Sequence, residues 1–264
     1  MTILGIYRAV FAREIFYKLN RLLYRCSLSG LGILNYESSK VSGEDVFLVK
    51  FLKGKGDVVV FDVGANIGSY TRAIHNASRN ARIYAFEPHP ATYKKLCENI
   101  CDNNIELLNV AVGDAAGSLS LYDYELNDGS SHASLYKDVI ENIHKAKAIS
   151  HDVEVICLDQ FSTMRAIEKI TLLKIDTEGH ELAVLKGAGE LIGGGRIDAI
   201  HFEFNEMNVS SRTFFRDFWN SMPGYNFYRL LPNGMVEIDS YSPLFCEIFA
   251  YQNVVAIRED VSFV

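Results

Sequence analysis

The sequence predicts an α/β fold with a doubly wound, mostly parallel sheet, an antiparallel C-terminal edge and an N-terminal helical arm. Apolar, β-branched segments of strand length alternate with helical patterns from residue 57 onward. The strand segments are too apolar to have a solvated face, which is typical of parallel strands buried on both sides. With 264 residues, 48% of them hydrophobic, the chain can bury one large core.

The N-terminal segment differs in charge from the rest. Residues 1–25 carry five basic side chains and one acidic one, a net charge of +4, although the whole chain has −7. Apolar residues recur there at helical spacing, so we expect one amphipathic helix, in an arm of residues 1–45 that precedes a main domain of residues 46–264. The helix carries too many charges to span a bilayer. It either packs on the domain, forms an oligomer contact or attaches peripherally to an anionic membrane; the oligomeric state stays open.

The alternating pattern gives the main elements in order. Core strands are expected at 57–63, 81–87, 105–112, 170–176 and 197–205, and helices at 67–78, 90–103, 181–192 and 212–222. An insertion at 118–161 has short alternating strands around a Gly/Ser-rich loop. Three further strands, at 225–231, 234–239 and 247–257, are typical of an antiparallel edge on such a sheet.

The turn after the first strand is the strongest local signal. In an open parallel sheet, ligands bind beyond the carboxyl ends of the strands, where the strand order reverses. The first strand runs through Asp62 into "VGANIG", in which Gly64 permits a tight turn against a ligand and Gly68 permits close helix packing. Glu87 follows the second strand, where a carboxylate can accept hydrogen bonds from two ribose hydroxyls.

The spacing of the glycines separates the nucleoside cofactors. A dinucleotide site has G-x-G-x-x-G, whereas Asn66 stands at the middle glycine position here, and no lysine follows Gly68 as a P-loop requires. S-adenosylmethionine has no phosphate, and Asp62 offers its ammonium a carboxylate. We therefore expect S-adenosylmethionine, with a nicotinamide dehydrogenase as the competing enzyme class.

Four motifs extend this interpretation. "FDVGANIGSY", "YAFEPHP", "LNVAVGD" and "LKIDTEGHELAVLKGA", in this order, resemble the motif series of FkbM-type S-adenosylmethionine-dependent methyltransferases over about residues 57–205. The resemblance implies the class I, Rossmann-like methyltransferase fold and O-methylation of a hydroxyl on a glycan, a sugar-bearing natural product or a polyketide-like compound. It also implies cofactor-binding residues: Asp62, Gly64, Asn66 and Gly68 at the methionine end, Glu87 at the ribose, and Asn109, Ala111 and Val112 at the adenine.

Catalysis of methyl transfer to a hydroxyl requires alignment of the reacting atoms and removal of a proton. Asp176 follows the fourth core strand, and we assign it positioning and electrostatics, because a carboxylate beside a sulfonium is a weak base. His180 on the next turn, or Glu203 in the fifth core strand, is expected to take the proton. The choice stays open, since His180 can be a solvated helix-start residue and Glu203 can be the partner of Lys174.

Two further features concern the acceptor and a metal. Asp176, Glu203 and Asn205 offer hard oxygen ligands, so a divalent ion is a second mechanistic reading, although we do not expect one. In the insertion, Ser130, Ser131 and His132 can hydrogen-bond a carbohydrate as part of a lid, with a plain solvent loop as the alternative.

The leading functional hypothesis is an O-methyltransferase acting on a hydroxyl of a sugar or glycan. A non-sugar metabolite is the alternative acceptor, and a non-catalytic cofactor-binding protein is less favoured because acids follow three strands. The acidic composition argues against nucleic acid as a partner. No signal-peptide pattern is evident, and the five scattered cysteines predict free thiols, with Cys97 and Cys101 on the buried stripe of one helix. We therefore expect a cytoplasmic protein, peripheral attachment at the inner face of a membrane being the alternative.

Overall fold

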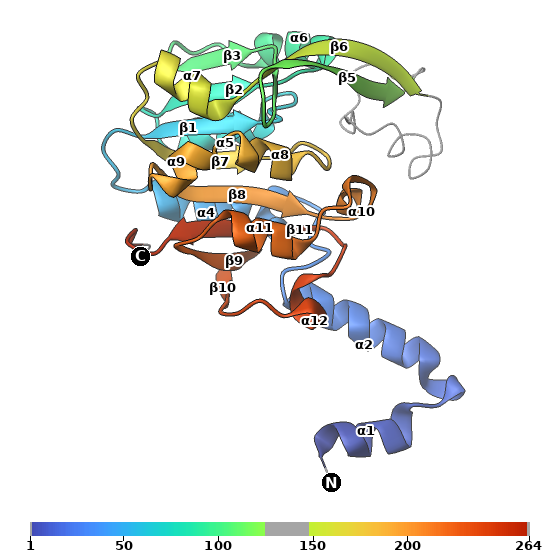
Figure 1. Ribbon diagram of the computed structural model, residues 1–264. Coiled ribbons are helices and arrows are strands. Elements are labelled where there is room, and N and C mark those ends of the chain that lie inside the picture. The colour runs from blue at the N-terminus through green and yellow to red at the C-terminus, as the bar shows by residue number, and fades with distance from the viewer. Residues whose placement is uncertain (1, 125–147, 263–264) are drawn as a thin grey trace.

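The computed structural model describes residues 2–124 and 148–262, and its main feature is a sheet of eight strands (Figure 1). The strands lie in the order β10-β9-β11-β8-β7-β1-β2-β3. Their bounds are β1 (Val59–Val63), β2 (Arg82–Phe86), β3 (Ile105–Leu108), β7 (Ile170–Ile175), β8 (Ile197–Phe204), β9 (Tyr225–Leu231), β10 (Gly234–Ile238) and β11 (Gln252–Arg258).

The strand directions confirm the predicted fold class. Strands β3, β2, β1, β7 and β8 pair in parallel, whereas β11 is antiparallel to both β8 and β9, and β10 is antiparallel to β9. The chain runs outward from β1 through β2 to β3 and then returns to β7 and β8 on the other side of β1. The strand order therefore reverses between β1 and β7, as in the class I methyltransferase fold.

Helices cover both faces of this sheet because the strands are apolar on both sides. One face packs against α4 (Glu44–Leu52), α5 (Ser69–Ala77) and α6 (Pro90–Asn99), and the other against α7 (Leu158–Met164), α8 (Glu181–Lys186), α9 (Gly189–Gly193) and α11 (Phe215–Ser221). Successive residues of β1 alternate between the two cores: Val60 packs with the α4 side and Phe61 with the α7 side, and both are fully buried.

The expected strand at 105–112 is divided in two, and the prediction of one strand is wrong. After β3 the chain turns at Asn109, whose amide donates to the carbonyl oxygens of Glu87 and Pro88 at 2.8 and 3.0 Å. The short strand β4 (Ala111–Val112) then joins a separate three-stranded sheet with β5 (Gly117–Tyr124) and β6 (Ala148–Ile156), in the order β4-β6-β5. The candidate acceptor residues Ser130, Ser131 and His132 lie outside the described residues.

Four other elements differ from the expectation. The helix at 181–192 is broken into α8 and α9 near Gly187, where a Cβ would lie 2.0 Å from the carbonyl oxygen of Gly113. The last strand begins only at Gln252, after the short helix α12 (Pro243–Cys246), and helix α10 (Met207–Ser211) precedes α11. Helix α6 ends at Asn99, so Cys101 is exposed and Cys97 half-buried, and the predicted buried stripe is wrong.

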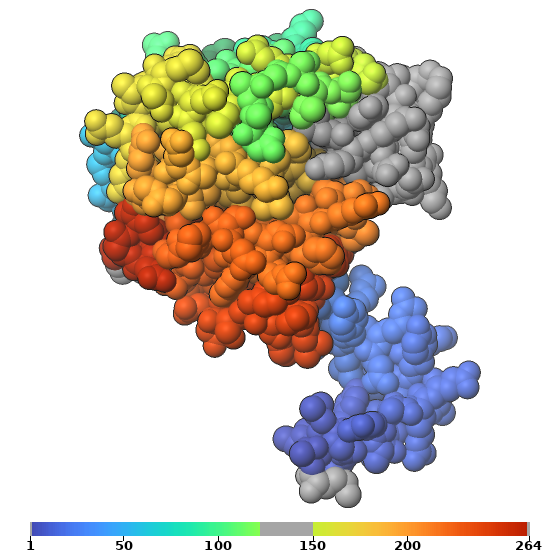
Figure 2. Space-filling model, viewed as in Figure 1, coloured from blue at the N-terminus to red at the C-terminus, as the bar shows by residue number. Residues whose placement is uncertain are grey.

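The N-terminal segment projects away from the body (Figures 1 and 2), and it is not one helix. Helix α1 (Ile3–Phe11) is separated from α2 (Tyr17–Gly30) by an extended Arg13 and the short turn η1 (Glu14–Phe16). Helix α1 buries no residue and α2 buries only Leu28, so their other apolar side chains are not buried on the domain. The oligomer and membrane contacts stay predictions. Within residues 2–124 and 148–262, no helix combines the length and the apolar character needed to cross a membrane.

The chain joins the body after α2. Ile33 forms an isolated antiparallel bridge with Gln252 of β11, and α3 (Ser39–Ser42) leads into α4. Phe47 and Leu48 of α4 are buried in the core between the sheet and helices α4 and α5. Helix α4 thus begins at the carboxyl edge of the sheet, and its first residue, Glu44, lines a pocket there.

Candidate active site

The site is built where β1 and β7 meet at the point of strand reversal. The backbone N–H of Asp176 donates to the carbonyl of Val63 at 2.9 Å, which continues the β1–β7 pairing past the strand ends. Gly64 follows with φ of +83°, and a Cβ there would lie 1.8 Å from the carbonyl oxygen of Asp176. Only glycine fits, because both the conformation and the space exclude a side chain.

Asn66 and Gly68, the other two residues of this turn that were expected to bind the cofactor, have different structural roles. Asn66 adopts a left-handed conformation, with φ of +50°, and its backbone N–H donates to Glu87 Oε2 at 2.9 Å. Gly68 lines neither of the two pockets at this edge of the sheet. A Cβ on Gly68 would be 2.7 Å from Ile100 and 2.8 Å from Leu96, so the glycine allows α5 to pack against the end of α6. The turn therefore connects the first strand to Glu87 and fixes the helix behind it.

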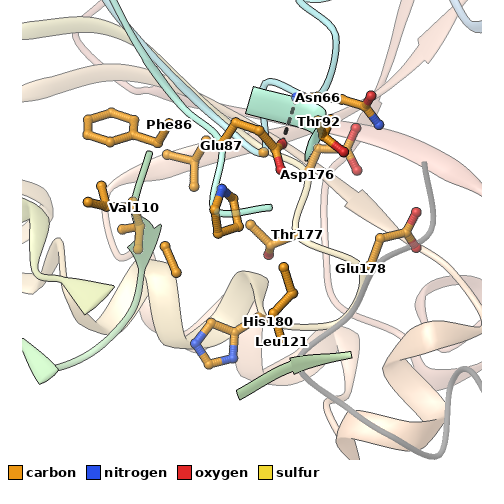
Figure 3. A pocket seen from close by; sticks show the side chains of 15 residues that line it. Asn66, Phe86, Glu87, Thr92, Val110, Leu121, Asp176, Thr177, Glu178 and His180 are labelled. Atoms are coloured by element: carbon orange, nitrogen blue, oxygen red, sulfur yellow. Dashed lines mark hydrogen bonds between the residues drawn. The ribbon is translucent and has the colours of Figure 1, made fainter. Parts of the chain in front are cut away.

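A first pocket lies beyond the ends of β1 and β2, with a volume of about 720 Å³ including space open to solvent (Figure 3). Its walls combine backbone of the glycine turn, apolar side chains and a few polar groups. The lining residues include Gly64, Asn66, Glu87, Thr92, Asp176 and His180, together with Val110–Val112. This size and composition are typical of a small-molecule site.

Glu87 is the most constrained polar group in the first pocket. Its carboxylate accepts two backbone hydrogen bonds at 2.9 Å, from Asn66 at Oε2 and from His89 at Oε1. The side chain is 6% exposed, and burial raises its pKa to about 7 despite these two bonds. Free lone pairs on both oxygens remain available to hydroxyl groups of a ligand.

The first pocket fits the nucleoside part of S-adenosylmethionine. Within the described part of the chain, the buried hydroxyl of Thr92 has no hydrogen-bond partner, so it can bind a ligand polar atom. Glu87 suits a ribose, and Val110–Val112 with Phe86 offer apolar surface for a base. Asn109 lies outside this wall and holds the turn after β2 through its two bonds to Glu87 and Pro88.

Asp62 is buried within strand β1, beneath both pockets. Its carboxylate is 1% exposed, points to the α5 face of the sheet and accepts a hydrogen bond from Thr71. Burial raises the pKa of Asp62 to about 6. Asp62 thus contributes charge beneath the site and lines neither cavity, and contact with the donor ammonium stays a prediction.

A second pocket lies on the other side of the Gly64 turn, toward α4 and α5, with about 1010 Å³ including space open to solvent. It shares Gly64, Asn66 and Asp176 with the first pocket. The polar side chains in its wall come from five elements, α3, α4, α5, β7 and β8, and the turns beside them: Ser39, Glu44, Asp45, Asn66, Ser69, Tyr70, Lys174, Asp176 and Glu203. Asp176 therefore stands at the boundary between the two cavities.

Lys174 is the central charge of the second pocket. Its side chain is 2% exposed, and its ammonium lies 3.7 Å from Asp176 Oδ2 and 3.9 Å from Glu44 Oε1. Burial alone would lower the pKa of Lys174, but Asp176, Glu203, Glu44 and Asp62 outweigh burial and raise it. Lys174 is therefore a permanent cation among carboxyl groups.

Glu203 lies beside Asp176 at the carboxyl edge of the sheet. The strand register places Phe202 opposite Ile175, so the next residue of each strand, Glu203 and Asp176, meet at this edge. Burial, and secondly the charge of Asp176, raise the pKa of Glu203 well above its ordinary value. A carboxylate with a raised pKa is a stronger proton acceptor than an exposed one.

A hydrogen-bonded network supports the floor of this pocket. His201 is fully buried, with Tyr70 at 2.7 Å from Nδ1 and Asn253 Oδ1 at 2.8 Å from Nε2. With the proton on Nε2, the ring donates to Asn253 and accepts from the Tyr70 hydroxyl. Burial and the charge of Lys174 hold the pKa of His201 well below its ordinary value, so the ring is neutral.

His180 lies at the other side of the first pocket from Glu87 in Figure 3. Its ring is next to the β4 strand, because a Cβ on Gly113 would be 3.3 Å from His180 Nε2. Burial lowers the pKa of His180. His180 and Glu203, the two candidate bases, therefore line different cavities.

The turn that carries Asp176 and His180 is organised by Glu181. Its Oε1 accepts hydrogen bonds from the backbone N–H of Thr177 and Gly179 at 3.1 and 2.9 Å, and its Oε2 from Asn208 at 3.3 Å. The side chain is 3% exposed. Glu181 thus holds the turn in place without touching either pocket.

Two of the three groups considered for a metal, Glu203 and Asn205, are hydrogen-bonded to each other. Asn205 donates its amide to Glu203 Oε2 at 3.3 Å, and its Oδ1 accepts from the N–H of Met207 at 2.8 Å. Among the residues that the structure describes, no group of three His, Cys, Asp or Glu side chains is placed to hold a metal ion.

Sequence reasoning did not identify several residues of the site. Thr92 lines the first pocket, and Glu44 and Tyr70 line the second, and none of these three was predicted. Lys174 was expected only as a partner for Glu203. A signal existed for Lys174, because a lysine in an otherwise apolar central strand needs a buried partner. None existed for Glu44, which lies far from the motifs in sequence.

Comparisons with known proteins identify the family. Residues 62–228 match the model of the methyltransferase FkbM domain. The chain is similar to the hexuronic acid methyltransferase AglP of Haloferax volcanii, with 30% identity over 55% of this chain and 61% of AglP. It is also similar to the 2-O-methyltransferase NoeI of Sinorhizobium fredii, with 25% identity over 69% of this chain and 77% of NoeI.

A third relative is the 31-O-demethyl-FK506 methyltransferase FkbM of Streptomyces tacrolimicus, with 30% identity over 50% of this chain and 59% of that protein. The match thus spans less than two thirds of AglP and of this FkbM. The family model, however, covers more than half of the present chain. The protein therefore belongs to the FkbM methyltransferase domain family, and its methyl donor is S-adenosylmethionine.

Proposed function

We propose that this protein is an O-methyltransferase that transfers the methyl group of S-adenosylmethionine to a hydroxyl of a sugar. The observation that carries the proposal is the position of Asp176 at the boundary of two cavities, with Glu203 beside it in the second one. The first cavity has the groups that a nucleoside needs, and the second has carboxyl groups that can receive a hydroxyl proton.

The residues of the first pocket hold the donor. Glu87 accepts hydrogen bonds from the ribose, Thr92 binds a further polar atom, and Val110–Val112 lie against the adenine. This placement brings His180 near the adenine, because its ring is next to β4. Glu203 is therefore the better general base, since it lines the second pocket beside Asp176.

These groups account for each bond that forms or breaks and for the proton that is released. S-adenosylmethionine supplies a methyl group on a sulfonium, whose C–S bond breaks with its electron pair remaining on sulfur as S-adenosylhomocysteine leaves. The acceptor oxygen forms the new C–O bond with a lone pair, and its proton passes to the carboxylate of Glu203. Asp176 lies at the junction of the cavities, where its negative charge stabilises the positive charge of the sulfonium.

The names of the relatives support parts of this proposal. AglP is named for a sugar acid, and NoeI and the Streptomyces FkbM are named for transfer to an oxygen. The last of these names supports the second candidate, transfer to a hydroxyl of a non-sugar metabolite.

Mass spectrometry of cells with and without the gene tests the proposal. We expect one or more glycans or glycosides to lose one CH₂ mass per sugar residue in the deletion strain. The wild-type gene should restore that mass, and Asp176→Asn should not. A mass loss in a compound without sugar would favour the metabolite acceptor, and the absence of any loss would contradict transfer altogether.

A further inference from the structure

The second pocket contains a buried cation whose hydrogen-bonding capacity is unused. Within the described part of the chain, Lys174 Nζ has no hydrogen-bond partner, although it is buried. Its nearest carboxylate oxygens, at 3.7 and 3.9 Å on Asp176 and Glu44, are beyond hydrogen-bond distance. Buried N–H groups without partners are costly, and Lys174 lines an open cavity, so a ligand oxygen there would satisfy them.

The other groups around this ammonium have their own partners. Tyr70 lies with its ring 5.4 Å from Lys174 Nζ, but its hydroxyl donates to His201. Glu44 Oε2 accepts from Ser42 at 2.8 Å and Glu203 Oε2 from Asn205 at 3.3 Å, and both residues line the pocket. The cavity thus offers N–H donors from Lys174 and acceptor oxygens from Glu44, Asp176 and Glu203.

This mixture suits a hydroxyl better than an anion. A hydroxyl oxygen accepts one hydrogen bond and donates another, so Lys174 and a carboxylate can bind it together. An acceptor with its own carboxylate would meet four acidic side chains and one lysine in the wall of the pocket. The carboxylate of the donor has a different partner available, because the first turn of α5 presents backbone N–H groups.

We propose that the second pocket receives the acceptor as an uncharged polyhydroxy group, and that Lys174 donates a hydrogen bond to the oxygen that becomes methylated. This inference rests on the proposed O-methyltransferase function and names its acceptor site and acceptor class. Lys174 orients a lone pair of that oxygen, and the proton leaves to Glu203 as the C–O bond forms. Lys174 is then a catalytic residue, since it touches the reacting oxygen.

Lys174→Met tests the role of the ammonium, with Lys169→Met as the matched control. Lys169 lies just before the same strand, but its side chain is 56% exposed and pairs with Asp198 at 3.0 Å. Each purified full-length variant is titrated with S-adenosylmethionine by calorimetry. Each is then incubated with methyl-labelled S-adenosylmethionine and an extract of the deletion strain, in which unmethylated acceptor accumulates, and labelled products are separated by anion exchange after glycan hydrolysis.

We expect Lys174→Met to bind the donor within about threefold of wild type and to lose at least about 100-fold in labelling rate, as for removal of an oxyanion donor. Lys169→Met should keep both properties, and the label should be in a neutral sugar. Should Lys174→Met not fold, Lys174→Gln makes the same comparison, with an expected loss of at least about tenfold because its neutral amide is a weaker donor.

Four outcomes would overturn the inference. Full labelling by Lys174→Met or Lys174→Gln would show that methyl transfer does not need the Lys174 ammonium. A large loss of donor affinity in these variants instead assigns Lys174 to the carboxylate of S-adenosylmethionine. Label in an acidic sugar contradicts the uncharged acceptor while leaving the O-methyltransferase function intact, whereas no label with the wild-type protein contradicts that function and this inference together.

Discussion

The affinity for S-adenosylmethionine should depend on pH through Glu87. Each carboxylate oxygen of Glu87 accepts one backbone hydrogen bond, so a proton on the carboxyl group would occupy a lone pair that is otherwise left for a ribose hydroxyl and would weaken the site. Because burial raises the pKa of Glu87 to about 7, the group is about 90% ionised at pH 8 and about 10% ionised at pH 6. The dissociation constant should therefore rise about tenfold between pH 8 and pH 6, which corresponds to about 1.4 kcal/mol.

Isothermal titration calorimetry of the full chain at both pH values measures this change. Glu87→Gln should bind more weakly at pH 8 and should retain at most about a twofold dependence, the part that Asp62 with its pKa of about 6 can supply. Glu98→Gln, an exposed change on the nearby helix α6, should keep the tenfold dependence of wild type. Equal dissociation constants for wild type at pH 8 and pH 6 would refute the assigned role of Glu87.

Three further results follow from the packing and charges of the site. Gly64→Ala should destabilise the fold by more than about 2 kcal/mol in urea unfolding, because its Cβ would lie 1.8 Å from a backbone oxygen, whereas Gly56→Ala, with open space around it, should be neutral or stabilising. Glu181→Ala should cost about 2–5 kcal/mol in the same assay, since two backbone N–H groups lose their partner; a change below about 1 kcal/mol would contradict this. The kcat/KM for the acceptor should rise with pH and reach its plateau at a higher pH than an ordinary carboxyl group would give, because burial raises the pKa of Glu203, and Glu203→Gln should lower it about 10²–10⁴-fold; a flat wild-type profile would rule out Glu203 as the base.

The donor side of the site follows from local rules that a sequence contains. A glycine at a strand-to-helix turn and an acid after the next strand occupy neighbouring positions in any parallel sheet, so Gly64 and Glu87 could be predicted without knowing the rest of the fold. The prediction for Asp62 did not take into account that successive side chains of a strand point to opposite faces of the sheet. Asp62 lies within β1, its side chain points to the face covered by α4 and α5, and it therefore lies below the turn that would contact a donor.

The second pocket could not be predicted in the same way, because its wall comes from segments that are distant in sequence. Glu44 comes from the start of α4, Tyr70 from α5 and Glu203 from β8, and Glu44 lies outside the part of the chain that matches the family model. No spacing rule links these positions. Their proximity depends on the strand order and on the way the segment after the arm returns to the carboxyl edge of the sheet.

Strand pairing also explains why the ammonium of Lys174 faces the cavity. Asp62, Lys174 and His201 are in register on the adjacent strands β1, β7 and β8, so they form one row on the α4 face of the sheet. Asp62 is bonded to Thr71, and His201 uses both ring nitrogens with Tyr70 and Asn253. Neither neighbour in the row forms a hydrogen bond with Lys174, and its closest carboxylates are those of Asp176 and Glu44 at the pocket. A ligand oxygen that enters there meets a cation that has already lost its water during folding, and binding it requires little further desolvation.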